Sequence, residues 1–470
     1  MNDWTRRKPV IAAGGGGADK LPPTLHWPQL MAMGVGAIIG TGILTLIGVG
    51  VDRAGPAVLI AFAIAGAVCA CAALAYAELS SMMPAVGSAY SYSYAGLGEV
   101  FAWVVGWSLI LEYSLVVSTV AVGWSGYASP LLVGAGFPEA LTRGPELGGL
   151  INLPAIAIIA VVAGLLLMGT RESARVNAAL VVVKIVTLLL FVGYTLPYFD
   201  AANLDPFMPY GYAAHVDGDG VQRGVMAAAA IIFFAFYGFD AISTAAEETR
   251  RPARDLPIAI IGSMVACTLI YMLVAAAAVG ATPFASFADS PEPLALILRS
   301  IGQGGIAQIV ATAAVVALPT VLLAFLYGQS RIFLAMARDG FLPQRLAHIS
   351  RRGTPTRITL LTAAIVAVLA GLLPIGKVAA LANAGTLIAF MAVGVCLLVL
   401  RRRAPDVPRP FRVRAVWLVG LGTLGGCLYL FFSLPADTLL WCLIWNLFGL
   451  ALYAVYGRFR SALARSVPGV

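Results

Sequence analysis

Long apolar runs separated by short polar stretches extend over nearly the whole chain, and this pattern predicts an all-α membrane protein. A helix needs about 20 apolar residues to cross a bilayer. Twelve runs approach or exceed this length, at residues 30–51, 57–80, 97–125, 150–168, 177–197, 226–247, 257–280, 305–330, 357–374, 378–400, 414–433 and 438–457. The pattern therefore predicts twelve transmembrane helices.

The distribution of positive charge sets the expected orientation. With the N-terminus inside the cell, 24 of the 30 Lys and Arg residues lie on the cytoplasmic side, five lie outside, and Lys184 lies within a span. Because cytoplasmic loops carry an excess of Lys and Arg, this bias favours an even number of spans with both ends inside. We expect a multi-pass protein of the inner (plasma) membrane, with residues 1–29 and 458–470 as cytoplasmic tails.

Composition agrees with this class and argues against several others. Hydrophobic residues make up 60% of the chain and charged residues 11%, with a mean hydropathy of +0.91, as in polytopic membrane proteins. The six cysteines lie in apolar spans and the three histidines in tails or loops. We therefore expect no metal, no cofactor and no enzymatic activity. The net charge of +8 is interpreted as topological and as attractive to anionic membrane lipid, not as a nucleic-acid surface.

The first span carries glycines at 34, 36, 40 and 42, each of which costs about 1 kcal/mol in a helix interior. An unwound segment inside a membrane is tolerated where it is buried in protein or lines a cavity. Its freed N–H groups would then suit an anion. The alternative is a small-residue face for close helix packing.

A second break is predicted in the sixth span, where residues 233–244 include Gly238 and the charged Asp240. Breaks in spans one and six are what an inverted repeat of five helices predicts, and transporters bind their substrate where such half-helices meet. The spacing therefore favours the binding-site interpretation of the first break.

Several short motifs in this sequence resemble those of a known protein family. They are found at residues 34–43, 76–79, 84–90, 233–249 and 335–340. In these the chain resembles the amino acid-polyamine-organocation superfamily of secondary transporters, above all its cationic amino acid transporter branch. The resemblance implies a leucine-transporter-type fold, with inverted repeats at 30–197 and 226–400 and two additional spans within 412–457. Animal members of the branch have fourteen spans, so their selectivity for arginine and lysine is not carried over.

Three ionisable residues lie inside predicted spans, namely Glu112, Lys184 and Asp240. Such residues are costly in a membrane and are usually functional. Glu112 and Lys184 form either a structural ion pair or a proton-coupling pair. In related bacterial transporters, a lysine on span five occupies the place where sodium sits in sodium-coupled relatives. Lys184 matches that lysine, which favours proton coupling. Asp240 either caps the half-helix after Gly238 or meets a substrate ammonium.

Other polar residues receive weaker interpretations. Glu78 is expected at a gate or helix end, and Glu247 and Glu248 in ion pairs with the neighbouring Arg250 and Arg251. Ser330 and Thr386 are candidates for polar lining, against ordinary hydrogen bonds between membrane helices.

We expect the carboxylate of an α-amino acid to accept hydrogen bonds from the N–H groups of break one. Its ammonium group would donate to carbonyl groups of break two. Phe234 and Phe239 would cover the site as apolar lids. The predicted substrate-binding residues are Ile39, Gly40, Thr41, Gly42, Phe234, Ala235, Tyr237 and Asp240. The predicted function is secondary active, proton-coupled symport of cationic or small neutral amino acids by alternating access. An exchanger and a non-transporting amino acid sensor are the alternatives, and a small membrane-protein partner of unknown identity stays open.

Overall fold

The structure, a computed structural model, describes residues 6–10, 21–145, 148–288, 290, 292–372 and 375–465. The α-helices are α2 (Trp27–Ile38), α3 (Thr41–Leu44), α4 (Leu46–Ala54), α5 (Val58–Met82), α6 (Ala89–Gly96), α7 (Glu99–Gly134), α8 (Leu153–Met168), α9 (Thr170–Thr195), α10 (Val225–Ile232), α11 (Asp240–Thr244), α12 (Pro252–Ala281), α13 (Pro293–Ser300), α14 (Gly304–Ala317), α15 (Pro319–Arg338), α16 (Thr356–Leu372), α17 (Ile375–Arg403), α18 (Val416–Phe432), α19 (Ala436–Leu452), α20 (Arg458–Arg460) and α21 (Ala462–Arg465).

Shorter elements connect them. The 3₁₀ turns are η2 (Gly55–Ala57), η3 (Glu139–Leu141), η5 (Leu196–Tyr198), η6 (Ala201–Leu204), η7 (Phe233–Ala235), η8 (Phe284–Ser286) and η9 (Gln344–Ala347), and η10 (Tyr453–Gly457) is a π-helical turn. Two short strands, β1 (His215–Val216) and β2 (Gln222–Arg223), pair antiparallel, with His215 opposite Arg223. Apart from this pair of strands and the connecting turns and loops, the described chain is helical, which confirms the predicted all-α class.

Nine helical segments of the described chain are long and apolar enough to cross a membrane. Helices α8, α16 and α18, each 16 or 17 residues long, are apolar but shorter. They coincide with the predicted spans four, nine and eleven. The count of twelve spans therefore stays a prediction.

Proline decides several helix boundaries. Pro28, Pro252 and Pro319 lie in the first turn of α2, α12 and α15, where the missing N–H removes no intrahelical hydrogen bond. Pro319 also divides the predicted eighth span, because α14 ends at Ala317 before α15 begins. Within a continuous helix, a proline ring would clash with the carbonyl group four residues earlier.

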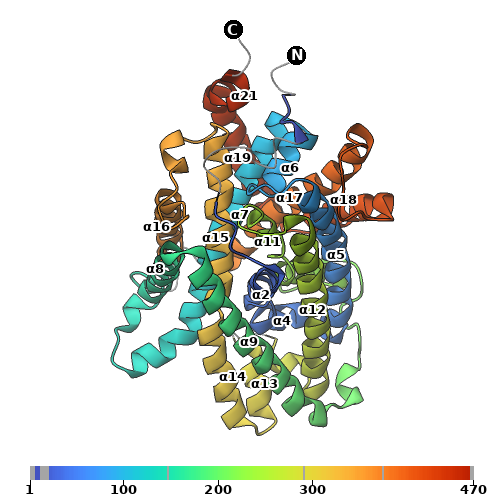
Figure 1. Ribbon diagram of the computed structural model, residues 1–470. Coiled ribbons are helices and arrows are strands. Elements are labelled where there is room, and N and C mark those ends of the chain that lie inside the picture. Colours follow the sequence, from blue (N-terminus) through green and yellow to red (C-terminus); the bar gives the residue numbers. More distant parts are fainter. Residues whose placement is uncertain are drawn as a thin grey trace.

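The broken first span lies at the centre of the molecule. Helix α2 packs against α9, α12 and α15, and Figure 1 shows it in the middle of the bundle with α9 running obliquely past it. A second group joins α7 to α15 and α17. Arg6 contacts both Glu99 at the start of α7 and the carbonyl group of Arg458, so the N-terminal segment and the C-terminal helices lie at the same end of the molecule.

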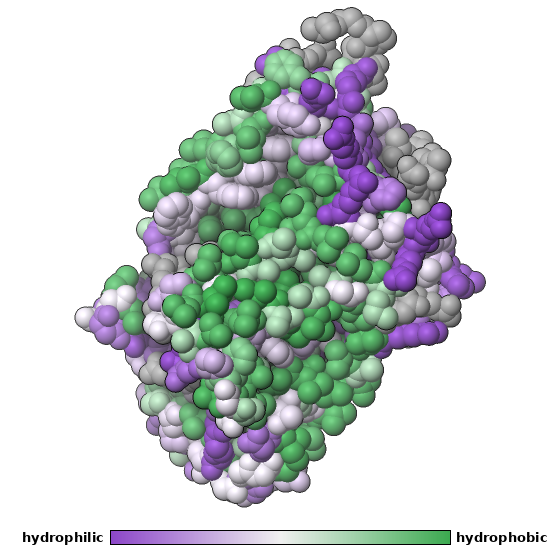
Figure 2. Space-filling model, turned by 90° about the vertical axis from the view of Figure 1, so that its left-hand side faces the viewer, coloured by the Kyte–Doolittle hydropathy of each residue, from purple (hydrophilic) through white to green (hydrophobic). Residues whose placement is uncertain are grey.

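The outer surface is largely apolar around the middle of the molecule. On the face that Figure 2 shows, hydrophobic side chains form a broad central area, and hydrophilic side chains lie around its margins. Val161 of α8 and Leu360 and Val368 of α16 are more than half exposed. Such a continuous apolar band faces lipid in a membrane protein.

Candidate functional site: two broken helices

Break one separates α2 from α3 at Ile39 and Gly40. Ile39 is extended, with φ −72° and ψ 101°, and Gly40 follows with φ −153° and ψ −144°. Within the described residues, the backbone N–H groups of Gly40, Thr41, Gly42 and Ile43 donate to no protein acceptor. The helix is therefore interrupted where the glycine pattern predicted it, with adjacent donors left available.

Break two lies between α10 and α11. The chain passes through the turn η7 and then through Gly238, whose φ is +116°. A side chain at Gly238 would be strained, and its Cβ would lie 2.9 Å from the Cβ of Ala37 in α2. The carbonyl groups of Phe234, Ala235 and Tyr237 accept no hydrogen bond from the described residues. This break therefore offers acceptors, while break one offers donors.

The two breaks are in direct contact. A Cβ built on Gly42 would lie 2.4 Å from the Cα of Ala235, a distance that no side chain tolerates. Glycine at this position is thus required for the backbones to meet. In this structure break one therefore lies directly against break two at Gly42 and Ala235.

Two buried hydroxyl groups beside the breaks have no hydrogen-bond partner among the described residues. Thr41 is 6% exposed and Tyr237 is 2% exposed, yet neither Thr41 Oγ1 nor Tyr237 Oη forms a hydrogen bond with a described residue. The ring of Tyr237 lies edge-on to Phe234 at 4.9 Å and to Phe325 at 5.8 Å. A buried polar group without a partner costs about 1–3 kcal/mol, so both hydroxyls are poised for a ligand or water.

Asp240 is fully engaged by the protein. One carboxylate oxygen accepts the N–H of Gly238 at 3.1 Å, and the other accepts the hydroxyl of Tyr113 from α7 at 2.5 Å. Its side chain does not cap the N-terminus of α11 in the ordinary way. It instead fixes the positive-φ residue of break two and joins that break to α7. The predicted contact with a substrate ammonium stays a prediction.

Lys184 points from α9 to the end of α2. Its Nζ donates to the carbonyl oxygen of Gly36 at 2.9 Å and also to that of Ile39. Two other side chains join it there, because Tyr271 donates to Ile38 O at 2.6 Å and Thr320 to Gly36 O at 3.1 Å. Carbonyl groups at a helix end need such donors, and a cation suits the negative end of the helix dipole.

Glu112 does not form the ion pair with Lys184 that was one of the two interpretations. Its side chain is fully buried, and neither carboxylate oxygen accepts a hydrogen bond of ordinary geometry from the described residues. The lysine is instead satisfied by backbone carbonyls, so no carboxylate is needed to hold it at the end of α2.

The other predicted polar residues have structural partners. Glu78 accepts both Nε and Nη2 of Arg401, each at 2.6 Å, which agrees with a helix-end role. Thr386 donates to Ala382 O on its own helix. Phe239 packs against Tyr76 and Phe390 at 5.7 and 5.2 Å; it belongs to that aromatic cluster of α5 and α17, and its expected role as a lid over the site has no support in these contacts.

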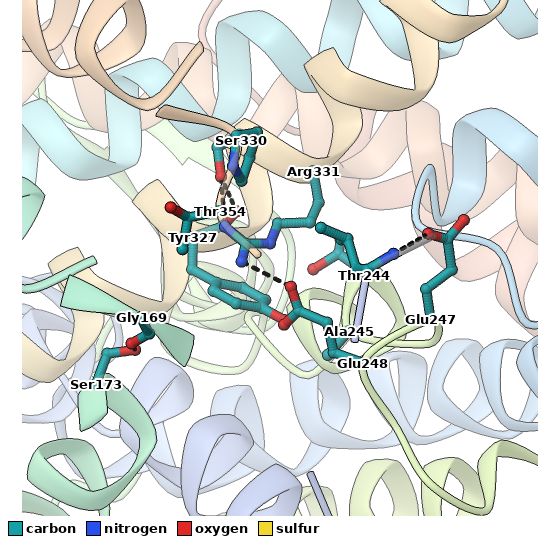
Figure 3. Close-up of polar contacts among 12 residues, drawn as sticks. Gly169, Ser173, Thr244, Ala245, Glu247, Glu248, Tyr327, Ser330, Arg331 and Thr354 are labelled. Carbon is teal, nitrogen blue, oxygen red and sulfur yellow. Dashed lines mark hydrogen bonds and ion pairs between the residues drawn. The ribbon is translucent and has the colours of Figure 1, made fainter. Parts of the chain in front are cut away.

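A buried ion pair beside break two joins α15 to the segment between α11 and α12, and Figure 3 shows it. Arg331 of α15 donates to Glu248 at 2.7 Å, and both side chains are at most 1% exposed. Tyr327 donates to the same carboxylate, and the guanidinium lies 3.7 Å from the centre of its ring. Ser330, predicted as lining, accepts from Arg331 at 2.9 Å.

The neighbouring Glu247 pairs with Arg338 at 2.9 Å. The prediction of ion pairing for both glutamates was therefore correct in kind, but the partners come from α15, and Arg250 and Arg251 are not among them. Arg331 and Tyr327 were missed by sequence reasoning. Their spacing of four residues on one helix, with an arginine inside an apolar run, was the available signal.

Comparison with known proteins agrees with this geometry. A family model described as amino acid permease matches residues 25–455, which confirms the resemblance to the amino acid-polyamine-organocation superfamily. The chain is 43% identical over 468 residues to the branched-chain amino acid permease BcaP of Bacillus subtilis, covering 97% of this chain and 98% of that protein.

Two further relatives differ in their named substrates. The methylthioribose transporter of Bacillus subtilis is 39% identical over 470 residues, covering 98% of this chain and all of that protein. The vacuolar cationic amino acid transporter 4 of Arabidopsis thaliana is 36% identical over 427 residues, covering 86% of this chain and 68% of that protein. The match over nearly the whole chain establishes that this protein belongs to the amino acid permease family.

Proposed function

We propose that this protein is a proton-coupled symporter of neutral aliphatic α-amino acids, with branched-chain amino acids as the preferred substrates. The observation that carries the proposal is the pairing of free donors at break one with free acceptors at break two. A zwitterionic amino acid carries the complementary pair of groups. The choice of side chain rests on the name of the 43% identical relative, a branched-chain amino acid permease.

Substrate binding follows from the two breaks. The carboxylate would accept the N–H groups of Gly40, Thr41 and Gly42 and the Thr41 hydroxyl, and the ammonium would donate to the carbonyl groups around Ala235. Binding would then supply what the unpartnered groups lack. Because Gly42 and Ala235 are in contact here, the substrate enters only when the two breaks move apart. That motion is the local form of alternating access in this proposal, on a leucine-transporter-type fold with inverted repeats at 30–197 and 226–400.

Lys184 would couple this motion to the proton. Its ammonium donates to Gly36 and Ile39, which directly precede break one. Charged donors form stronger hydrogen bonds than neutral ones, so loss of the proton would loosen the end of α2. The proton would then bias the position of break one. Glu112, which is buried and has no hydrogen-bond partner in the described part of the chain, is proposed as a second proton-holding group, next in sequence to the Tyr113 that binds Asp240.

The test is transport of radiolabelled L-leucine into proteoliposomes that contain the purified protein. We expect saturable uptake that an inward-acid gradient stimulates and that is unchanged when potassium replaces sodium. Uptake that requires internal amino acid would instead indicate an exchanger, and binding without flux a sensor. Methylthioribose belongs in the panel because a 39% identical relative is named for it. Its transport in preference to every amino acid would overturn the proposal.

Gly42→Leu, a natural first choice to block the substrate, is a poor probe in this structure. Its side chain would collide with the backbone of Ala235 and disturb the contact between the breaks as well as the site. Replacement of Thr41 by valine keeps the shape of the side chain and is the sharper variant.

A further inference from the structure

A cavity opens beside break one, on the side away from the ion pair of Glu248 and Arg331. It has a volume of about 240 Å³ and is lined by Thr45, Val122, Gly123, Gly126, Tyr127, Pro130 and Glu292. Most of these residues belong to α7, whose exposed Pro130 and buried Val122 mark the two ends of the lining. Val122 and Pro130 are eight positions apart, which corresponds to about 12 Å along a helix. The cavity is therefore a corridor that leads inward from the surface.

The inner end of this corridor meets break one. Gly123 lies so close to Thr41 that a Cβ on the glycine would be 3.2 Å from Thr41 Cγ2. Tyr127 donates to the carbonyl oxygen of Leu44 at 3.3 Å, and Thr45 follows directly at the end of α3. A molecule at the inner end of the corridor would thus be separated only by Gly123 from Thr41, whose hydroxyl has no partner among the described residues.

The corridor has one charged lining residue, the carboxylate of Glu292, against walls of valine, glycine and proline. Glu292 is about one third exposed and is held by Arg299 at 2.5 Å. A carboxylate beside an apolar wall suits a ligand with an ammonium group and an aliphatic side chain. It repels a ligand with a second carboxylate, which is how a site rejects the wrong charge.

We propose that this corridor is an outer binding site for the incoming amino acid, in which Glu292 takes the α-ammonium group before the substrate reaches the two breaks. The inference rests on the proposed function and adds Glu292 to it as a residue that selects the substrate by charge. The ammonium competes with Arg299 for the carboxylate. Amino acids with acidic side chains are excluded at this point, ahead of the central site.

The experiment measures initial rates of L-leucine uptake in proteoliposomes for the wild type, Glu292→Gln, Arg299→Gln and Glu139→Gln. Glu139 is the matched control, because it forms a similar pair with Arg143 at 2.8 Å, is largely exposed and lies outside the corridor lining. Charge pairs near a surface contribute about 1 kcal/mol, which corresponds to about a five-fold change. We expect Glu292→Gln to raise KM about five-fold with little change in maximal rate, and Glu139→Gln to change neither.

Two further readouts separate recognition from a merely structural pair. Arg299→Gln frees the carboxylate, so its KM should equal or fall below that of the wild type. Inhibition of leucine uptake by L-glutamate should be stronger in Glu292→Gln than in the wild type. An unchanged KM in Glu292→Gln, or an equal rise in Arg299→Gln, would overturn the outer site while leaving the transport proposal intact. Absence of leucine transport by the wild type would overturn the transport proposal itself.

Discussion

Buried polar groups have protein partners in the ion pairs of Glu248 and Glu78, whereas hydroxyl groups at the two breaks lack them within the described chain. Glu248 accepts hydrogen bonds from both Arg331 and Tyr327, and Glu78 accepts from Nε and Nη2 of Arg401. At the breaks, the hydroxyls of Thr41 and Tyr237 have none among the described residues. Satisfied buried networks rigidify a structure, and unsatisfied groups need another explanation. The contrast separates a polar network that the protein itself satisfies from the two breaks, where we propose that the substrate binds.

The largest effect should come from breaking the buried ion pair. Arg331→Met leaves Glu248 charged and buried, and removal of one partner of such a pair costs about 3–5 kcal/mol. We expect a large fall in the thermal unfolding temperature of the purified protein. The double variant Arg331→Met/Glu248→Gln should recover part of the loss, because no orphaned charge remains. If the double variant is as unstable as Arg331→Met alone, the orphaned charge of Glu248 is not the source of the loss.

The next effect concerns coupling. Lys184→Ala removes the ammonium that donates to Gly36 and Ile39, and we expect gradient-driven accumulation of leucine to fall at least about ten-fold, or about 1.4 kcal/mol. Leucine binding by the purified protein should fall less. Thr187→Val, one turn away on the same helix, is the control. A well-folded Lys184→Ala protein that still concentrates leucine on a proton gradient would refute the coupling role.

A smaller effect should follow at break one. Thr41→Val removes the unpartnered hydroxyl but keeps the volume, and one hydrogen bond contributes about 1 kcal/mol. We expect the Kd for leucine, measured by calorimetry, to rise about five-fold while the unfolding temperature stays unchanged or rises. Thr423→Val is the control, since that hydroxyl donates to Val419 O within its own helix. Equal Kd values for Thr41→Val and the wild type would remove Thr41 from the site.

The smallest effect should come from Glu247→Gln, one residue before the buried glutamate. Its partner Arg338 is a quarter exposed, and partly exposed ion pairs contribute about 0–1 kcal/mol. We expect a shift in unfolding temperature far smaller than that of Arg331→Met. Comparable shifts would mean that burial is not what distinguishes the two pairs.

Local sequence was enough to predict the breaks and the class of the protein. The glycines of the first span, with Gly238 and Asp240 in the sixth, marked both interruptions, because glycine weakens a helix wherever it lies. Apolar runs and the charge bias predicted the helical membrane fold, and motifs in order predicted the family that the comparison establishes. These features depend on neighbouring residues along the chain or on its composition.

The tertiary structure decided which groups meet. Lys184 is satisfied by the carbonyls of Gly36 and Ile39 and not by Glu112, and Glu248 pairs with Arg331 and not with the adjacent arginines. Asp240 binds Tyr113, a residue 127 positions away in the chain. A sequence fixes which charges must be buried, since each is costly in an apolar medium. Which partner relieves that cost depends on how distant helices pack, and no local pattern contains that information.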